Sequence, residues 1–470
     1  MHPLAKLDHA HIWHPFTQMQ DWVTREPIII ASAKGAMLRD VHGREYFDGN
    51  SSIWTNLHGH NHPAINAAIN RQLRQVAHTS ALGLANEPAS ILASRLVQSV
   101  NAPNAKPWLG KVFFSDDGST AIEVALKLSY EFTRRTRPEK PRFLAVDGAY
   151  HGDTIGAVSL GQIGIFHSAY KGLLFKSDKV PAPYCYRCPF NKAAPERRDA
   201  REYRMCGFEC ASRFERKVES AKRAGRPYTG FVFEPVMQGA AGMIAQPKGW
   251  LSRVTAAARA HGAQLLADEV MTGFSRTGPL LACHKEQVAP DFVALAKGLT
   301  GGYLPMAATL TSQEVFNAFL GKYEEFKTFF HGHSYTGNQL GSAAALASLD
   351  LLKASGASMK RQRLTDSLAA ELATLWRLEN VGDIRQEGLI AGIEIVRDWR
   401  TKAPFDLRER AGIRVCEALA KRGVLTRPIG NVIVVMPPYC ATPQQLRHYM
   451  AALGESIEQT LALKPLRLKR

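Results

Sequence analysis

Five short apolar segments, spread along the middle of the chain, constrain the fold more than any other feature of the sequence. Each is four or five residues long, and the gaps between them leave room for helical crossovers. The segments are 111–114, 142–146, 230–233, 263–267 and 291–295. Uninterrupted apolar runs of this length are typical of parallel strands that are buried on both faces. The sequence therefore predicts an α/β fold with a large, mostly parallel sheet.

The two ends of the chain show a different pattern, in which helical and strand segments are mixed. The expected helices are 339–352 and 410–422, and the expected strands are 389–395 and 431–436. We predict that residues 1–60 and 331–470 together form a smaller α+β domain, and that residues 61–330 form the large domain. A length of 470 residues suits such a pair of domains. An insert that contains cysteines is expected at 184–226, inside the large domain.

The chain carries an unusual excess of basic residues, with 59 Lys and Arg against 42 Asp and Glu and a net charge of +17. Ten of these charges lie in two segments, 185–226 and 461–470. Apart from the cysteine cluster in the first of them, neither segment contains a recognisable nucleic-acid-binding module, so we interpret both as solvated surface. The apolar share of 45% excludes a disordered chain. We expect no nucleic-acid partner.

Three further properties bear on the location of the protein. No segment approaches the ~18 uninterrupted apolar residues of a membrane-spanning helix. The first eight residues lack the apolar core of a secretory signal. Seven cysteines in 470 residues do not make a disulfide scaffold. We therefore expect a cytoplasmic protein with reduced thiols and no membrane partner.

Polar residues follow the predicted strands, at the edge of the sheet where the chemistry of open α/β folds gathers. Gly118 and Ser119 open a helix after the first strand, where free amides and the helix dipole favour an anion. Tyr150 follows the second strand, Asp268 the fourth and Lys297 the fifth. A buried lysine loses its proton and becomes an imine-forming nucleophile, and a buried carboxylate requires a partner.

Each of these residues alone has an ordinary structural explanation, such as a helix cap, an ion pair or a lysine that reaches solvent. Together they match what pyridoxal 5'-phosphate requires. Gly118 and Ser119 would bind its phosphate, and Tyr150 would lie over its ring. Asp268 would keep the ring nitrogen protonated, and Lys297 would bond to the cofactor covalently. The sequence therefore predicts Lys297 and Asp268 as catalytic residues of a pyridoxal-phosphate enzyme.

Two runs of sequence around these residues resemble the class III aminotransferases of fold type I. They are 265–278 (LLADEVMTGFSRTG) and 294–302 (ALAKGLTGG). The resemblance covers nearly the whole chain, and it implies small-molecule substrates and a homodimer whose active sites are shared between subunits. His333 and Ser334 would then reach the phosphate from the other subunit, and Gly332 would line the site. Arg427 would clamp a substrate carboxylate with its planar guanidinium.

Four stretches resemble the branch of this family that acts in biotin biosynthesis. They are 11–19 (HIWHPFTQM), 150–154 (YHGDT), 331–338 (HGHSYTGN) and 425–428 (LTRP). This resemblance implies transfer of an amino group from S-adenosylmethionine to 8-amino-7-oxononanoate. Phe16 and Ile53 stand where the family has a Tyr and a Trp that contact substrate. Because a lost hydroxyl changes which substrate a site prefers, L-lysine stays open as the alternative donor.

The insert carries one pair of cysteines at Cys185 and Cys188, and a second pair at Cys206 and Cys210. Two close pairs that bracket a loop resemble structural zinc sites, in which four thiolates surround the ion. The second pair has three intervening residues, one more than the first. The sequence therefore predicts a candidate structural zinc site, with reduced thiols or a disulfide as the alternatives.

Two other functions stay open at this point. A general ω-amino-acid:pyruvate aminotransferase would carry the same cofactor residues but would accept pyruvate. A basic zinc-ribbon protein would bind nucleic acid through the insert. Its affinity would weaken with salt and would survive replacement of Lys297.

Overall fold

The large sheet has seven strands, and it contains all five strands predicted from the apolar segments. The computed structural model describes residues 1–101, 107–138, 140–161 and 163–461. In spatial order the strands are β4 (Lys111–Ser115), β12 (Ala307–Thr311), β11 (Phe292–Leu295), β10 (Gln264–Asp268), β7 (Gly230–Phe233), β5 (Phe143–Val146) and β6 (Asp178–Val180). Strand β12 runs antiparallel to both of its neighbours, and the others are parallel to one another. The predicted large, mostly parallel sheet is confirmed.

The two strands that the sequence did not reveal lack an apolar run. Strand β12 consists of alanine, threonine and one leucine, although all five of its residues are buried. Strand β6 is only three residues long and begins with two charged residues at the edge of the sheet. Both strands depend on pairing with neighbours rather than on a pattern of their own.

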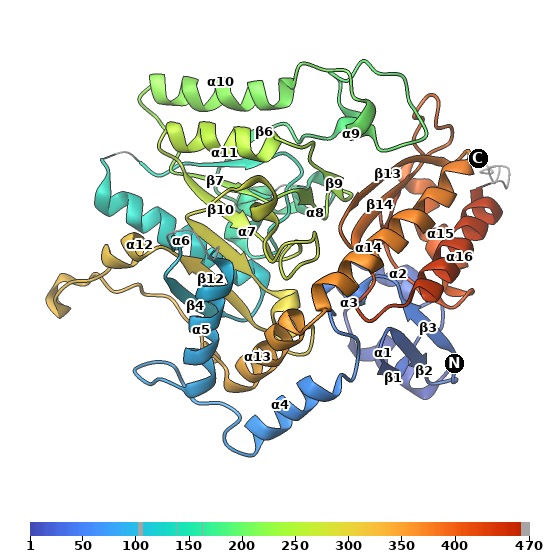
Figure 1. Cartoon of the computed structure of the whole chain (residues 1–470), viewed down its shortest axis with the longest axis horizontal. Helices are drawn as coiled ribbons and strands as arrows, with labels where there is room; N and C mark the ends of the chain where they lie inside the picture. The colour runs from blue at the N-terminus through green and yellow to red at the C-terminus, as the bar shows by residue number, and fades with distance from the viewer. Residues whose placement is uncertain (102–106, 139, 162, 462–470) are drawn as a thin grey trace.

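Helices cover both faces of the large sheet, which is why its strands are apolar along their whole length (Figure 1). On one face, α10 (Glu209–Arg223) and α11 (Trp250–Ala260) share an apolar core with Leu265 of β10. On the other face, α6 (Gly118–Thr136) shares a core with Leu266. Consecutive residues of one strand therefore belong to different cores, as expected for a strand between two helical layers.

The two chain ends build two smaller sheets. The first contains β1 (Ile30–Lys34), β2 (Met37–Asp40), β3 (Glu45–Asp48) and β15 (Val424–Leu425). The second contains β13 (Val381–Glu387), β14 (Ile390–Ile395), β17 (Val432–Val435) and β16 (Pro428–Ile429). Because β15 pairs in parallel with β3, the N-terminal and C-terminal parts of the chain meet in one sheet. The expectation of a smaller α+β part formed by both ends is confirmed.

The remaining helices connect and cover these sheets. They are α1 (Pro3–His11), α2 (Met19–Trp22), α3 (Ser51–Trp54), α4 (Pro63–Leu73), α5 (Glu87–Val100), α7 (Ile155–Leu160), α8 (Gly164–His167), α9 (Ala200–Tyr203), α12 (Gln313–Asn317), α13 (Gln339–Lys353), α14 (Ala357–Ala373), α15 (Ala411–Ala420) and α16 (Pro443–Leu461), and a short hairpin joins β8 (Met237–Gln238) to β9 (Ile244–Ala245). Helix α13 packs against α4 and α5 and shares an apolar core with β11 and β12.

The domain limits at residues 60 and 330 remain a prediction. Within the described ranges, no helix is both long and apolar enough to cross a membrane.

Part of the cysteine-containing insert is bound to the C-terminal part of the chain. Three of its arginines donate hydrogen bonds there: Arg187 to Glu394 (2.7 Å), Arg197 to the carbonyls of Leu378 and Val381 (2.5 and 2.7 Å), and Arg201 to the Gln386 carbonyl (2.9 Å). The interpretation as solvated surface is therefore wrong for these three arginines, whereas other basic residues of the insert, such as Arg213, Arg216 and Arg223, are exposed as expected. The basic tail residues Lys464, Arg467, Lys469 and Arg470 lie outside the described residues.

Candidate active site

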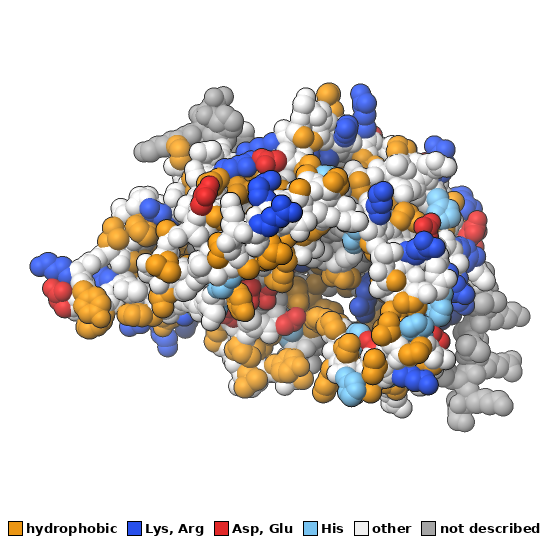
Figure 2. Space-filling view, turned by 90° about the horizontal axis from the view of Figure 1, so that it is seen from below, with side chains coloured by type: hydrophobic (Ala, Val, Ile, Leu, Met, Phe, Trp, Pro, Cys, Tyr) orange, Lys and Arg blue, Asp and Glu red, His pale blue; other side chains and the backbone are white. Residues whose placement is uncertain are grey.

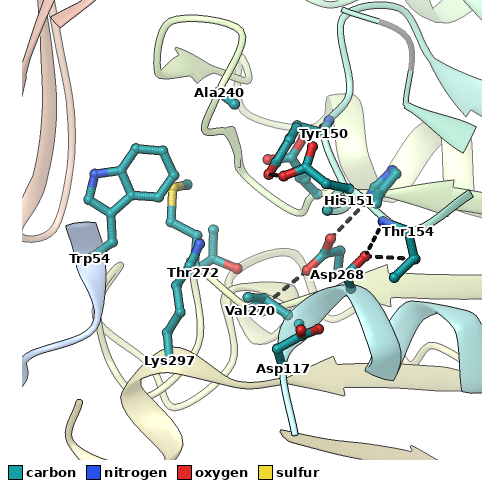
Figure 3. A pocket seen from close by; sticks show the side chains of 16 residues that line it. Trp54, Asp117, Tyr150, His151, Thr154, Ala240, Asp268, Val270, Thr272 and Lys297 are labelled. Carbon is teal, nitrogen blue, oxygen red and sulfur yellow. Dashed lines mark hydrogen bonds and ion pairs between the residues drawn. The ribbon is translucent and has the colours of Figure 1, made fainter. Parts of the chain in front are cut away.

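The carboxyl ends of five strands open into one cavity of about 350 Å³ (Figure 3). Its walls come largely from the residues that follow β4, β5, β7, β10 and β11. Five of the predicted site residues line it, namely Gly118, Ser119, Tyr150, Asp268 and Lys297. The structure therefore brings together, at one edge of the sheet, the residues expected to hold the cofactor.

Lys297 extends from the end of β11 into the cavity, toward the ring of Trp54 (Figure 3). Its Nζ lies 4.7 Å from the centroid of that ring. Burial lowers the pKa of Lys297, although the charges of Asp268 and Glu234 act in the opposite direction. Among the described residues, no hydrogen bond or ion pair holds the amine. A lysine in this state is available as a neutral nucleophile.

Trp54, which the sequence did not single out, lies in a run of four residues with left-handed backbone. The φ angles of Ser51, Ser52, Ile53 and Trp54 range from 46° to 72°. Non-glycine residues rarely adopt such angles, so four in succession store strain at the wall of the site. Ser51 Oγ donates a hydrogen bond of 2.6 Å to the Met436 carbonyl and anchors the run. The indole of Trp54 thereby lines the cavity, while Ile53 is exposed.

Asp268 ends β10, and its carboxylate is oriented by a buried histidine. His151 Nδ1 donates to Asp268 Oδ2 at 2.7 Å, and the Val270 amide donates to the other oxygen at 3.1 Å. Burial by itself lowers the pKa of His151, but the hydrogen bond and charge of Asp268 raise it overall. The two hydrogen bonds therefore hold the Asp268 carboxylate in one orientation. His151 has no role among the predictions from sequence, although its place beside Tyr150 after a strand is a signal.

The start of α6 forms a cradle that suits a phosphate group. The Asp117 side chain caps the helix by accepting from the Thr120 amide at 2.8 Å. This leaves the amides of Gly118 and Ser119 as donors at the positive end of the helix dipole. A Cβ at Gly118 would lie 2.7 Å from a methyl carbon of Val270, so only glycine fits there.

A buried glutamate fixes the loop that carries Tyr150. Glu234 accepts hydrogen bonds from the Tyr150 amide at 3.1 Å and from the Gly239 amide at 2.7 Å. Burial raises the pKa of Glu234 to about 7. The Tyr150 hydroxyl donates to Asp153 at 2.6 Å, which holds the ring at the cavity wall. Glu234 directly follows the third predicted strand, and this position is the feature of the sequence that could have identified it as a site residue.

The chemistry of these donors fits pyridoxal 5'-phosphate. The α6 cradle supplies amides and a hydroxyl for the phosphate, Asp268 supplies a carboxylate for the ring nitrogen, and Lys297 supplies an amine for covalent attachment. The cavity is concave and combines the apolar ring of Trp54 with these few polar groups, as small-molecule sites commonly do.

Six predicted site residues do not line the cavity of the single chain. They are Phe16, Ile53, Gly332, His333, Ser334 and Arg427. Arg427 is exposed, and within the described parts of the chain it has no hydrogen-bond or ion-pair partner. The Ser334 carbonyl accepts from His78 at 2.7 Å. Phe16 is 59% exposed, and its ring centroid lies 5.3 Å from that of Phe166. Their predicted roles with substrate and phosphate remain predictions.

The four cysteines of the insert are free thiols in the structure. Burial raises the pKa of Cys185 to about 12 and that of Cys210 to about 11, with contributions from the neighbouring thiols. Over the described ranges, no group of three or more His, Cys, Asp or Glu side chains is placed to hold a metal ion. The structure therefore does not confirm the zinc site predicted at Cys185, Cys188, Cys206 and Cys210.

The fold and the cavity define a pyridoxal-phosphate-dependent aminotransferase. The model of the family described as aminotransferase class-III matches residues 18–457, so the chain belongs to this family. Its large sheet with the smaller α+β part is the fold type I arrangement of these transferases.

Individual relatives narrow the comparison. The chain is 48% identical to the adenosylmethionine-8-amino-7-oxononanoate aminotransferase of Geobacter sulfurreducens, over 97% of each chain. A crystal structure of the Methanocaldococcus jannaschii protein of that name matches with a TM-score of 0.88 and 38% identity, covering 97% of this chain and 99% of that one. The PMP-bound aminotransferase of Vibrio fluvialis matches with the same TM-score but only 25% identity, covering 98% of this chain and 99% of that one.

Proposed function

We propose that the chain transfers an amino group to 8-amino-7-oxononanoate, a step of biotin biosynthesis, with S-adenosylmethionine as the donor. The observation that carries the proposal is the 48% identity, along nearly the full length, to a relative whose name states this donor and this acceptor. The cavity supports it, because it places an amine, a carboxylate and an anion cradle at one sheet edge.

The residues of the chain have distinct tasks in this reaction. Pyridoxal phosphate, when bound, supplies an electron sink that stabilises negative charge on the carbon bearing the transferred amine. Lys297 would hold the cofactor covalently between turnovers and would move the proton at that carbon. Asp268, oriented by His151, keeps the ring nitrogen protonated. The start of α6 anchors the phosphate, and Arg427 receives the carboxylate of the acceptor.

Conversion of the loaded enzyme by single donors tests the proposal. We expect S-adenosylmethionine to change the visible absorbance of the cofactor at least ~10²-fold faster than L-lysine, because a site built around one substrate discriminates strongly against another. Adding 8-amino-7-oxononanoate should then restore the original spectrum. Pyruvate should not restore it. The measurement is stopped-flow absorbance with each compound in turn.

Three results would change this assignment. Conversion by L-lysine alone would establish the alternative donor, and recovery with pyruvate would indicate a general ω-amino-acid:pyruvate aminotransferase. Conversion by neither donor would contradict the biotin assignment. Phe16→Tyr is the matched variant for the choice of amino donor, because it differs from the wild-type protein only by the hydroxyl that Phe16 lacks.

We also propose that the enzyme is a homodimer with shared active sites. In support, Gly332, His333 and Ser334 do not line the cavity of their own chain. Large aromatic side chains on either side of this loop are exposed, with Phe330 at 71% and Tyr335 at 64%. Figure 2 shows apolar side chains over much of one face of the molecule. We propose in addition that the enzyme is cytoplasmic, because free thiols are typical of a reducing compartment.

We expect the purified protein to have twice the mass of one chain, because burying exposed aromatic side chains favours association. Size-exclusion chromatography with light scattering measures this mass. A fully active species with the mass of a single chain would contradict the shared site.

A further inference from the structure

Glu123 lies on α6 behind the phosphate cradle, and its carboxylate does not line the cavity. One of its oxygens, Oε1, accepts three hydrogen bonds from the start of α7, of which Thr154 is the N-cap residue. The donors are Thr154 Oγ1 (2.6 Å), the Gly156 amide (2.7 Å) and the Ala157 amide (3.1 Å). A Cβ at Gly156 would lie 2.2 Å from Oε2, so the start of α7 approaches the carboxylate as closely as a glycine allows.

These contacts determine the direction of the hydrogen bond between Ser119 and Thr154. An ionised carboxylate accepts and cannot donate, so the Thr154 hydroxyl gives its proton to Glu123. The proton in the 2.7 Å contact between Ser119 Oγ and Thr154 Oγ1 must then come from Ser119. Ser119 Oγ also accepts from the Thr154 amide at 3.0 Å. The Ser119 hydroxyl is therefore held at two points before any ligand arrives.

The neighbouring backbone leaves Ser119 little freedom. Gly152 has a φ of +113°, and a Cβ there would lie 2.3 Å from the side-chain atoms of Ser119. Thr154 is on the wall of the cavity (Figure 3). When an anion enters, the Ser119 hydrogen can turn from Thr154 to the anion, while the Thr154 amide keeps Oγ in place.

We propose that Glu123 is a positioning residue for the phosphate of the cofactor. It makes Thr154 an acceptor, and Thr154 holds the Ser119 hydroxyl at the start of α6. The bonds to Gly156 and Ala157 join the start of α7 to α6. The cradle is thus assembled in advance, which reduces the conformational freedom that the protein loses when the phosphate binds. This proposal rests on the assignment of Gly118 and Ser119 to the phosphate.

Binding of pyridoxal 5'-phosphate and of pyridoxal to the cofactor-free full-length protein tests the proposal. The two ligands differ only in the phosphate. We expect Glu123→Ala to weaken binding of the phosphate form about tenfold, since it removes the acceptor that orders Thr154 and Ser119. Binding of pyridoxal should change less than about twofold. Spectroscopic titration gives both dissociation constants.

Three further variants sharpen the test. Thr154→Val removes the hydroxyl but keeps the shape, so it should show the same selective loss as Glu123→Ala. Glu123→Gln keeps an acceptor oxygen and should restore most of the affinity. Glu131→Ala is the control, because Glu131 lies on the same helix and pairs with Arg135 away from the cavity.

Equal losses for both ligands would overturn the proposal, because Glu123 would then support only the general stability of the site. Unchanged affinity for both ligands would overturn it as well. If Glu123→Ala does not fold, Thr154→Val carries the same comparison. Failure of the wild-type protein to use either amino donor would contradict the proposed function instead. The role of Glu123 would still be tested separately, by the ratio of the affinities for pyridoxal 5'-phosphate and pyridoxal.

Discussion

Replacing Lys297 with alanine is expected to abolish amino transfer, with a fall in kcat of about 10⁴-fold or more. This lysine is both the nucleophile that holds the cofactor and the group that moves the proton. In the described part of the chain no second lysine lines the cavity, so nothing takes over these tasks. We also expect the purified variant to be colourless. Turnover with saturating donor and the visible spectrum measure the two effects.

Two variants control this result. Lys297→Arg keeps a positive charge in the cavity but cannot form the covalent bond, so it should behave like the alanine variant. Lys360→Ala changes an exposed lysine of α14 and should leave colour and turnover unchanged. A yellow and active Lys297→Ala protein would contradict the assigned role.

Replacing Asp268 with asparagine is expected to lower kcat about 10³-fold, the range seen when one preorganised electrostatic group is removed. Asparagine is nearly the same size, but it carries no charge to keep the ring nitrogen protonated. The pKa of His151 should fall as well, because the hydrogen bond and charge of Asp268 raise it against the effect of burial. Since Lys297 is intact, the protein should still bind the cofactor and keep its colour. Steady-state kinetics and the visible spectrum separate this outcome from that of Lys297→Ala.

Asp153→Asn is the matched comparison for Asp268. Asp153 also lines the cavity, but its carboxylate accepts from the Tyr150 hydroxyl instead of from His151. We expect its loss to reduce kcat by no more than about tenfold, since it removes one hydrogen-bond partner. Similar losses for the two variants would contradict a special role for Asp268.

The parts of the fold that follow from local pattern were predictable. The five apolar segments became β4, β5, β7, β10 and β11, because a strand buried on both faces must be apolar throughout. The ends of parallel strands gather at one edge, so five site residues could be placed together from their positions after those strands. Strand β12 could not be found this way, since its small residues become a strand only by pairing with β4 and β11.

The missed parts of the site depend on contacts between distant segments. Trp54 reaches the cavity only because a strained run is anchored on Met436, far along the chain. His151 and Thr154 acquire their roles from partners on β10 and α6, which local sequence does not show. The attachment of Arg197 and Arg201 could not be predicted for the same reason, because these two arginines of the insert bind carbonyl groups of the C-terminal sheet.

The attachment of the insert also sets an order of events during synthesis. Arg197 and the Trp376 carbonyl that it binds are 179 residues apart, so the arginine leaves the ribosome first. At ordinary rates of translation the gap lasts roughly 10–40 s. Throughout that interval Arg197 lacks its carbonyl partners, so its guanidinium must be satisfied by water instead. The insert can therefore complete these contacts only after the C-terminal sheet has been synthesised.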